Sequence, residues 1–433
     1  MTFAKYNSLI VILIVAVVLR LGLLWGNIQV NPSYFHIDLA LMQEQINSPD
    51  QPYHNGFGSE ISNVAYSIVK GQGFSSPFGG RTGPTGWVAP GMVAIYAMAF
   101  YLFGPFSFGS VLSLFLLSVL LSLATVLLVY SVALKIFDHR PSALAGSLLY
   151  ALSPHDLLVF YKTSQQDFNF FPFLFILNLF VFLTFYQQRT ARNLVCFSLV
   201  AAVTALFNPV FLAPLTMCII FPLFCNREQR LQAAVQIAAG ILIIVVFLGS
   251  YSIYQKQRLG VWTLVKSNGI YELYQGNVPD FNGILTMELF HKYHPIKNIN
   301  EYQRYRTLGE TEYIASKRSL FLEQFELTRF LSLSARRFTA FYFVFPALKH
   351  ATPLHYLLYA LRGLGLVLYL MLRFRRMKPL EMLVVSYILV YSLPYCLVGV
   401  MYRYSFPIVP LTMMLLARAV FLIKDALKKK GAI

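Results

Sequence analysis

Four ionisable residues at the ends of apolar segments have side chains suited to chemistry. Glu60 and Asp167 carry carboxylates, which accept protons as general bases, whereas Lys162 and Arg403 carry cations that bind phosphate. Simpler roles are equally open to them. A carboxylate at a helix start is stabilised by the helix dipole, and a cation near the end of a membrane helix extends toward the interface. The choice depends on whether the fold brings these residues together.

Hydrophobic helices must position these residues, because apolar runs recur along the whole chain. Of the 433 residues, 57% are hydrophobic and 12% are charged, whereas a soluble protein has about 25% charged residues. We predict an all-α polytopic membrane protein with about ten transmembrane helices. The predicted helices are 8–25, 110–134, 142–160, 168–187, 194–207, 210–225, 231–254, 354–372, 379–400 and 405–423.

The basic residues indicate the orientation of the chain. A formal net charge of +17 would suggest a nucleic-acid partner in a soluble protein, but here most of the excess lies in short loops beside apolar runs. We therefore expect no nucleic-acid partner, both termini in the cytoplasm and the informative polar residues on the other side. The basic loops are Lys135/His139/Arg140, Arg189/Arg192, Arg227/Arg230, Arg373/Arg375/Arg376/Lys378 and the tail Lys424/Lys428/Lys429/Lys430.

The same orientation decides the place of the apolar segment 87–103. Counting it as a membrane span would put several basic loops outside, and prolines and glycines bound it at both ends. We interpret it as an interfacial or re-entrant helix in the first external loop. The predicted organisation is a transmembrane module at 1–254 with its external loop at 26–109, a small external lobe at 255–353, and C-terminal helices with a basic tail at 354–433.

Three external segments carry motifs in a fixed order. They resemble the GT-C superfamily of polytopic glycosyltransferases, most closely its bacterial branch related to protein mannosyltransferases and aminoarabinose transferases. Ser405 stands where the branch has a second arginine in its last motif. The motifs are Glu60-Ile-Ser-Asn-Val-Ala65 with Gly71-Gln-Gly-Phe-Ser-Ser-Pro77, then Ser267-Asn-Gly-Ile-Tyr-Glu272-Leu-Tyr-Gln-Gly-Asn277 with His294-Pro295 and Leu308-Gly-Glu310, and finally Tyr402-Arg403-Tyr404-Ser-Phe-Pro407-Ile-Val-Pro410.

The resemblance implies that the protein transfers a sugar from a polyprenyl-phosphate carrier to an acceptor at the outer membrane face. Glu60 would then take the proton of the acceptor hydroxyl. Asp167 would be a second acid that holds a metal or the acceptor, although an N-terminal helix charge explains it equally well. Many family members have paired acids in the first loop, whereas the neighbour of Glu60 is Ser59. Asp50 and Asp38 are therefore alternative bases.

The resemblance also implies cations or hydrogen-bond donors around the leaving phosphate. Arg403 and Lys162 are candidates for this role. His54 and Arg81 are further candidates for substrate binding, although His54 suits a structural hydrogen bond and Arg81 lies in a glycine-rich turn. The lipid tail of the donor would need an apolar groove between helices.

The histidine spacing predicts no metal site, and no cofactor is required, although a divalent metal at the acids stays open. The sequence has neither a P-loop nor a dinucleotide-binding fingerprint, which favours a lipid-linked donor over a nucleotide-linked one. Two other functions stay open: a secondary transporter or flippase of lipid-linked sugar, and a non-catalytic subunit with the same fold. Arg20 lies inside the first apolar run, where it would reach the interface or pair with an acid.

Overall fold

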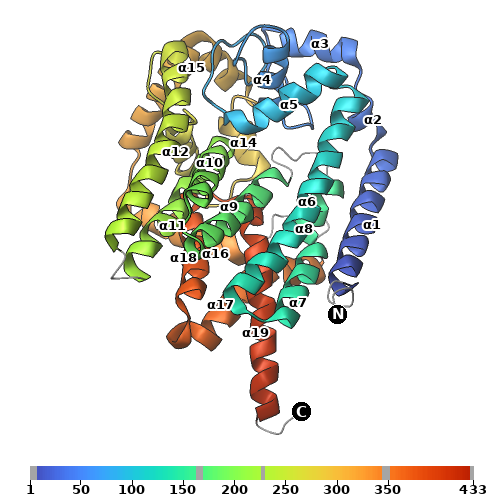
Figure 1. The fold of residues 1–433 in the computed structure, drawn as a ribbon. Coiled ribbons are helices and arrows are strands. Elements are labelled where there is room, and N and C mark those ends of the chain that lie inside the picture. Colours follow the sequence, from blue (N-terminus) through green and yellow to red (C-terminus); the bar gives the residue numbers. More distant parts are fainter. Residues whose placement is uncertain (1–6, 162–168, 226–229, 344–351, 430–433) are drawn as a thin grey trace.

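The computed structural model describes residues 7–161, 169–225, 230–343 and 352–429, and helices make up most of this part of the chain (Figure 1). Within it, eight helical segments are long and apolar enough to cross a membrane. The prediction of an all-α polytopic membrane protein is thus confirmed. The eight segments are α1 (Asn7–Val30), α6 (Phe108–Phe137), α7 with α8 (Arg140–Ala151, Pro154–Tyr161), α9 (Phe170–Gln187), α12 (Arg230–Leu259), α17 with η2 (Pro353–Arg373, Phe374–Arg376), α18 (Pro379–Val398) and η3 with α19 (Tyr402–Ile408, Val409–Lys429).

Two further predicted membrane helices form a short hairpin. Helix α10 (Ala191–Phe207) has 17 residues and α11 (Leu212–Cys225) has 14, against the roughly 20 that a bilayer core requires. The chain turns between them through the 3-10 helix η1 (Pro209–Phe211), where Asn208 Oδ1 accepts from the Val210 amide at 3.1 Å. Proline has no N–H and excludes α-conformation from the residue before it, so the helix ends at Phe207.

The first external loop contains four helices, α2 (Pro32–Phe35), α3 (Leu39–Asn47), α4 (Ser59–Val69) and α5 (Pro90–Phe103). Helix α5 has 14 residues, about 21 Å at 1.5 Å per residue, which is too short to span a bilayer. It lies across the ends of the long helices (Figure 1), as expected for a helix that does not cross. Helix α1 continues five residues beyond the predicted end at Trp25. The buried Asn27 lies in this added turn, where its Oδ1 accepts from Asn31 Nδ2 at 2.8 Å.

The segment predicted as an external lobe begins after α12 and forms α13 (Gly269–Gly276), α14 (Met287–Tyr293), α15 (Ile299–Glu323) and α16 (Leu327–Phe343). Helix α15 bends at Gly309, whose φ of 74° is in the left-handed region. Helix α16 packs against α17 and α18, so it runs beside the apolar bundle. The first turn of α1 and the last turn of α19 both lie at the end of the molecule opposite α3, α4 and α15 (Figure 1).

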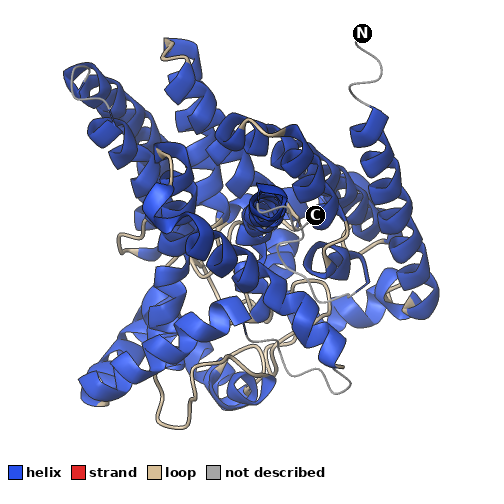
Figure 2. Cartoon of the chain, turned by 90° about the horizontal axis from the view of Figure 1, so that it is seen from below, coloured by secondary structure: helices blue, strands red, loops and turns tan. Residues whose placement is uncertain are grey.

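Two large hydrophobic clusters hold the fold together. One lies among the long helices, and α19, seen end-on in Figure 2, has other helices around it. The second joins the first external loop to the lobe through aromatic side chains. Trp87 lies 5.1 Å from Phe78 and 4.7 Å from Tyr271 between ring centroids, and Phe78 lies 4.8 Å from Tyr305. The loop and the lobe therefore share one core and hold each other in place.

A buried polar network lies among the membrane helices. Arg20 of α1 is fully buried and pairs with Asp156 of α8, and its Nε donates to Ser122 of α6 at 2.5 Å. Ser122 and Tyr150 each donate to Asp156 at 2.7 Å. Of the two roles open to Arg20, the structure shows pairing with an acid. The network ties α1 to three other helices, as is usual for charges buried in a membrane protein.

The joint between the lobe and the bundle depends on a close approach at Gly276, the last residue of α13. A Cβ built there would overlap the Val398 carbonyl oxygen at the end of α18. Arg337 of α16 closes the same joint by donating to the Gly276 and Leu397 carbonyls, the latter at 2.8 Å. Cationic donors suit the carbonyl ends of helices.

We expect Gly276→Ala to lower the stability of the protein by about 1–3 kcal/mol, because the added methyl forces the two backbones apart. Thermal unfolding in detergent measures the effect. The matched control is Gly269→Ala at the start of the same helix, where a Cβ would have no atom within 4 Å. Equal transition temperatures for the two variants would contradict this account of the joint.

Candidate functional site

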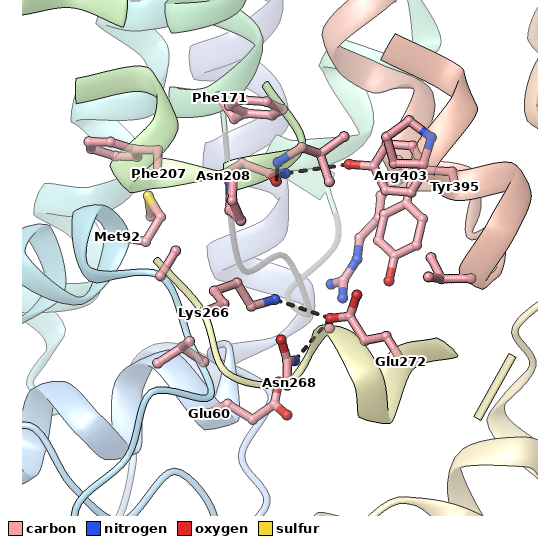
Figure 3. Close-up of a pocket in the computed structure, with 18 of the residues that line it drawn as sticks. Glu60, Met92, Phe171, Phe207, Asn208, Lys266, Asn268, Glu272, Tyr395 and Arg403 are labelled. Carbon is pink, nitrogen blue, oxygen red and sulfur yellow. Dashed lines mark hydrogen bonds and ion pairs between the residues drawn. The ribbon is translucent and has the colours of Figure 1, made fainter. Parts of the chain in front are cut away.

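A cavity of about 460 Å³ lies where the first external loop, the lobe and the long helices meet. The loop contributes Glu60 and Trp87, the lobe contributes residues 266–294, and the bundle contributes α9, the tip of the α10–α11 hairpin, α18 and η3. In the close-up, charged side chains gather on one side of the cavity, and Met92, Phe171 and Phe207 form an apolar wall on the other (Figure 3). The cavity thus has a polar half and an apolar half.

Glu60 lies in the first turn of α4 and lines the polar half. The turn before it is set by Gly58, whose φ of 74° is left-handed. The Glu60 side chain is 15% exposed, and its Oε1 accepts from the Trp87 indole Nε1 at 3.0 Å. The His294 Nε2 lies 3.4 Å from the same oxygen. A loop residue and a lobe residue therefore fix the direction of this carboxylate.

The tautomer of His294 follows from its other ring nitrogen. Nδ1 accepts from the Ile296 amide at 3.2 Å, so in the neutral ring the proton is on Nε2, which faces Glu60. Burial lowers the pKa of His294 below its usual value, and nearby Glu60 offsets this only in part. At neutral pH, His294 is therefore a neutral group whose N–H is directed at the Glu60 carboxylate.

This lowered pKa gives a pH dependence of stability. The unfolded state takes up the proton at a pKa of about 6.5, above the folded-state value, so stability is full above that pH and is lost as the pH falls below it. We expect the Tm of the wild type to fall more between pH 7.5 and 5.5 than the Tm of His294→Gln. Parallel curves for the two proteins would contradict this assignment.

A second charged group surrounds Glu272, in the first turn of α13. Its Oε1 lies 3.1 Å from the Lys266 ammonium and accepts from Asn268 Nδ2 at 2.9 Å. Arg403 of η3 directs its guanidinium toward the same carboxylate from the bundle side (Figure 3). Two cations, one from the lobe and one from the bundle, therefore lie close together at the cavity and are suited to bind an anion.

The structure brings two of the candidate residues to one cavity: Glu60 and Arg403 both line it. His54 and Arg81 are exposed and do not line it, so their binding roles stay predictions. Arg81 has a φ of 53°, which fits the glycine-rich turn that was its simpler interpretation. Lys162 and Asp167 lie outside the described residues, and their roles stay predictions as well.

The alternative bases have other positions. The Asp38 side chain caps α3 by accepting from the Ala40 and Leu41 amides at 3.0 and 3.2 Å. Asp50 is exposed in the loop after α3. Neither residue lines the cavity, so among these three acids of the first loop only Glu60 does.

Sequence reasoning missed the contribution of the lobe. Lys266, Asn268 and Glu272 lie within a motif that the resemblance uses, but none of the three was a candidate site residue. The spacing of Asn268 and Glu272 by four residues, a helical contact distance, was an available signal. His294 and Trp87 gave no such signal, because their approach to Glu60 depends on tertiary packing.

Comparisons with known proteins address the fold. No family model matches the chain, and no curated protein matches it. A structure of the oligosaccharyltransferase AglB from Archaeoglobus fulgidus, in complex with an inhibitory peptide and a dolichol-phosphate, matches 100% of the chain with a TM-score of 0.53 and 13% identity. The apo form of the oligosaccharyltransferase from the same organism also matches 100% of it, with a TM-score of 0.54 and 15% identity. The chain has a GT-C fold.

The GT-C fold accounts for the whole chain, but this chain spans only 52% of the length of either archaeal structure.

Among the described residues, no three His, Cys, Asp or Glu side chains are grouped so as to hold a metal ion. Asp167, the acid to which the resemblance gives a metal-holding role, is outside that set. The donors that the structure places at Glu60 are an indole and an imidazole N–H, which fix the orientation of the carboxylate.

Proposed function

We propose that this protein is a membrane glycosyltransferase that moves a sugar from a polyprenyl-phosphate carrier to an acceptor. The observation that carries the proposal is the cavity itself, which has the Glu60 carboxylate in its polar half, two cations beside Glu272, and an apolar wall opposite. The GT-C fold supports it, since the archaeal enzyme with this fold was solved with a dolichol-phosphate and a peptide.

In the proposed reaction, the acceptor hydroxyl attacks the anomeric carbon of the donor sugar while Glu60 takes the hydroxyl proton. The bond from the anomeric carbon to the phosphate oxygen breaks as the new glycosidic bond forms. Trp87 and His294 direct N–H groups at Glu60 Oε1, so they hold the carboxylate in one orientation for this transfer. Glu60 then gives this proton to water and is a carboxylate again for the next turnover.

The other product is the polyprenyl phosphate, which gains negative charge as the bond breaks. Lys266 and Arg403 are the cations that would meet this charge, the lysine as a point charge and the arginine through its planar fork. The apolar wall of Met92, Phe171 and Phe207 would take the first isoprene units of the carrier. One carrier molecule would thus contact both halves of the cavity.

The proposal includes a location. The basic loops favour cytoplasmic termini, so the cavity, which the first external loop and the lobe help to form, would face the outer side of a bacterial plasma membrane. The motifs favour the branch related to protein mannosyltransferases and aminoarabinose transferases. The donor would be a single hexose or pentose on a lipid phosphate.

The test is transfer from labelled polyprenyl-phosphate sugars by the purified protein in liposomes, with a panel of hexose and pentose donors and extracted membrane acceptors. Conversion of the donor to free polyprenyl phosphate with label in the acceptor fraction supports the proposal. Movement of the lipid-linked sugar across the bilayer without transfer would replace it with the flippase function. Binding of the carrier with neither activity would indicate a non-catalytic subunit.

A further inference from the structure

Glu310 is a buried carboxylate of α15, with 4% of its surface exposed. Four donors surround it. Oε1 accepts from the Gly86 amide at 2.7 Å and from the Ser267 hydroxyl at 2.6 Å, and Oε2 accepts from the Thr85 hydroxyl at 2.5 Å and from the Tyr305 hydroxyl at 2.8 Å. Among the residues that the structure describes, no Lys, Arg or His forms an ion pair with it.

Three of these donors lie in two segments next to residues that line the cavity, and the fourth, Tyr305, belongs to α15 itself. Thr85 and Gly86 immediately precede Trp87, whose own amide donates to Thr85 Oγ1 at 3.0 Å. Ser267 lies between Lys266 and Asn268, and its amide donates to the Gly86 carbonyl at 2.8 Å. Glu310 thus binds the residues next to Trp87, which holds Glu60, and next to Lys266.

A carboxylate suits this position better than other side chains. Its two oxygens have about four lone-pair sites, and all four donors point at them. An amide in its place would have a single oxygen, and that oxygen would accept from the Gly86 N–H, which can only donate. The amide nitrogen would then face the Thr85 and Tyr305 hydroxyls as a donor, so it could not accept from them. A buried group without a cation is retained only because its hydrogen bonds are satisfied.

We propose that Glu310 is a positioning residue that fixes the first external loop to the lobe, and so sets the Glu60 side of the cavity relative to the Lys266 side. This inference rests on the proposed function for its effect on catalysis. Its structural part is independent of that function, because Trp87 reports the position of the loop. Trp25 and Trp262 are each 66% exposed, so both can be replaced by Phe to leave Trp87 as the single tryptophan.

The first experiment is the fluorescence of Trp87 in this single-tryptophan background. Trp87 is 1% exposed, and we expect Glu310→Ala to shift its emission to longer wavelength and to increase its quenching by acrylamide. The matched control is Glu301→Gln on the same helix, because within the described residues the Glu301 carboxylate contacts Tyr313 and Lys317 of α15 itself, at 2.5 and 2.6 Å. Unchanged emission and quenching in folded Glu310→Ala would overturn the inference, whether or not the protein transfers sugar.

The second experiment measures sugar transfer. We expect Glu310→Ala to lower the rate on the order of 100-fold, as misplacement of reacting groups by about 1 Å does, while Glu301→Gln keeps most of the wild-type rate. If Glu310→Ala does not fold, Thr85→Val removes one donor and we expect a smaller change of the same kind in both readouts. Glu310→Gln is a second alternative variant. If Thr85→Val and Glu310→Gln, each tested as a single variant, both transfer sugar at the normal rate and both show normal Trp87 quenching, the positioning role is refuted.

Discussion

Replacing Glu60 by Gln should reduce sugar transfer on the order of 10²- to 10⁴-fold, the contribution of a positioned general base. The amide keeps the shape of the carboxylate and an oxygen that can accept from Trp87, so the first external loop stays in place. It cannot take the proton of the acceptor hydroxyl. The measurement is the initial rate with a labelled polyprenyl-phosphate sugar, at matched amounts of folded protein.

The control for this variant is Glu44→Gln, which removes an exposed acid from α3 in the same loop. It should transfer at the wild-type rate, because Glu44 does not line the cavity. Full activity in Glu60→Gln would keep the enzyme class and remove Glu60 as the base. Asp167 would then be the next residue to replace.

A second large effect is expected at the buried pair of Arg20 and Asp156. Asp156→Leu removes the carboxylate that pairs with the Arg20 guanidinium. The guanidinium is fully buried, so it would be left as an unpaired buried charge. Breaking a buried pair in this way costs about 3–5 kcal/mol. We expect a marked loss of thermal stability in detergent, measured by the fraction of protein that stays monodisperse after heating.

The double variant Arg20→Met with Asp156→Leu tests the physical reason. Removing both charges also removes the cost of burying them, so the double variant should be more stable than Asp156→Leu alone. Ser122 and Tyr150 would still lose their acceptor, so some loss relative to the wild type is expected. A double variant that is less stable than the single one would contradict the explanation that the unpaired buried charge causes the loss.

The fold was predictable because apolar length and basic loops are local signals. Eight of the ten predicted spans begin and end inside helices of the described residues, while the span 168–187 begins outside that set and the span 379–400 runs two residues past the end of α18. Helix α5 was excluded from the spans by the orientation of the basic loops and by the prolines and glycines around it. The end of α1 was placed too early, at Trp25 and not at Val30, since the polar Gly26-Asn27 pair resembles a loop. Asn27 is in fact buried and helical, which only its packing explains.

The site was predictable only where a motif marked it. Glu60 and Arg403 come from motifs that resemble known glycosyltransferases, and both line the cavity. Lys266 and His294 reach the same cavity from the lobe, and their approach depends on the shared aromatic core around Trp87. Local spacing contains no record of such long-range packing, so sequence reasoning named no site residue in the lobe.

The cavity is built from segments that lie far apart in the chain. Its Glu60 wall is synthesised well before η3, which contributes Arg403 and comes between α18 and α19. Domains fold progressively during synthesis, from the N-terminus onward. A nascent chain that stops before η3 therefore lacks one of the two cations, and the pair of Lys266 and Arg403 is complete only after α18 and η3 have been synthesised.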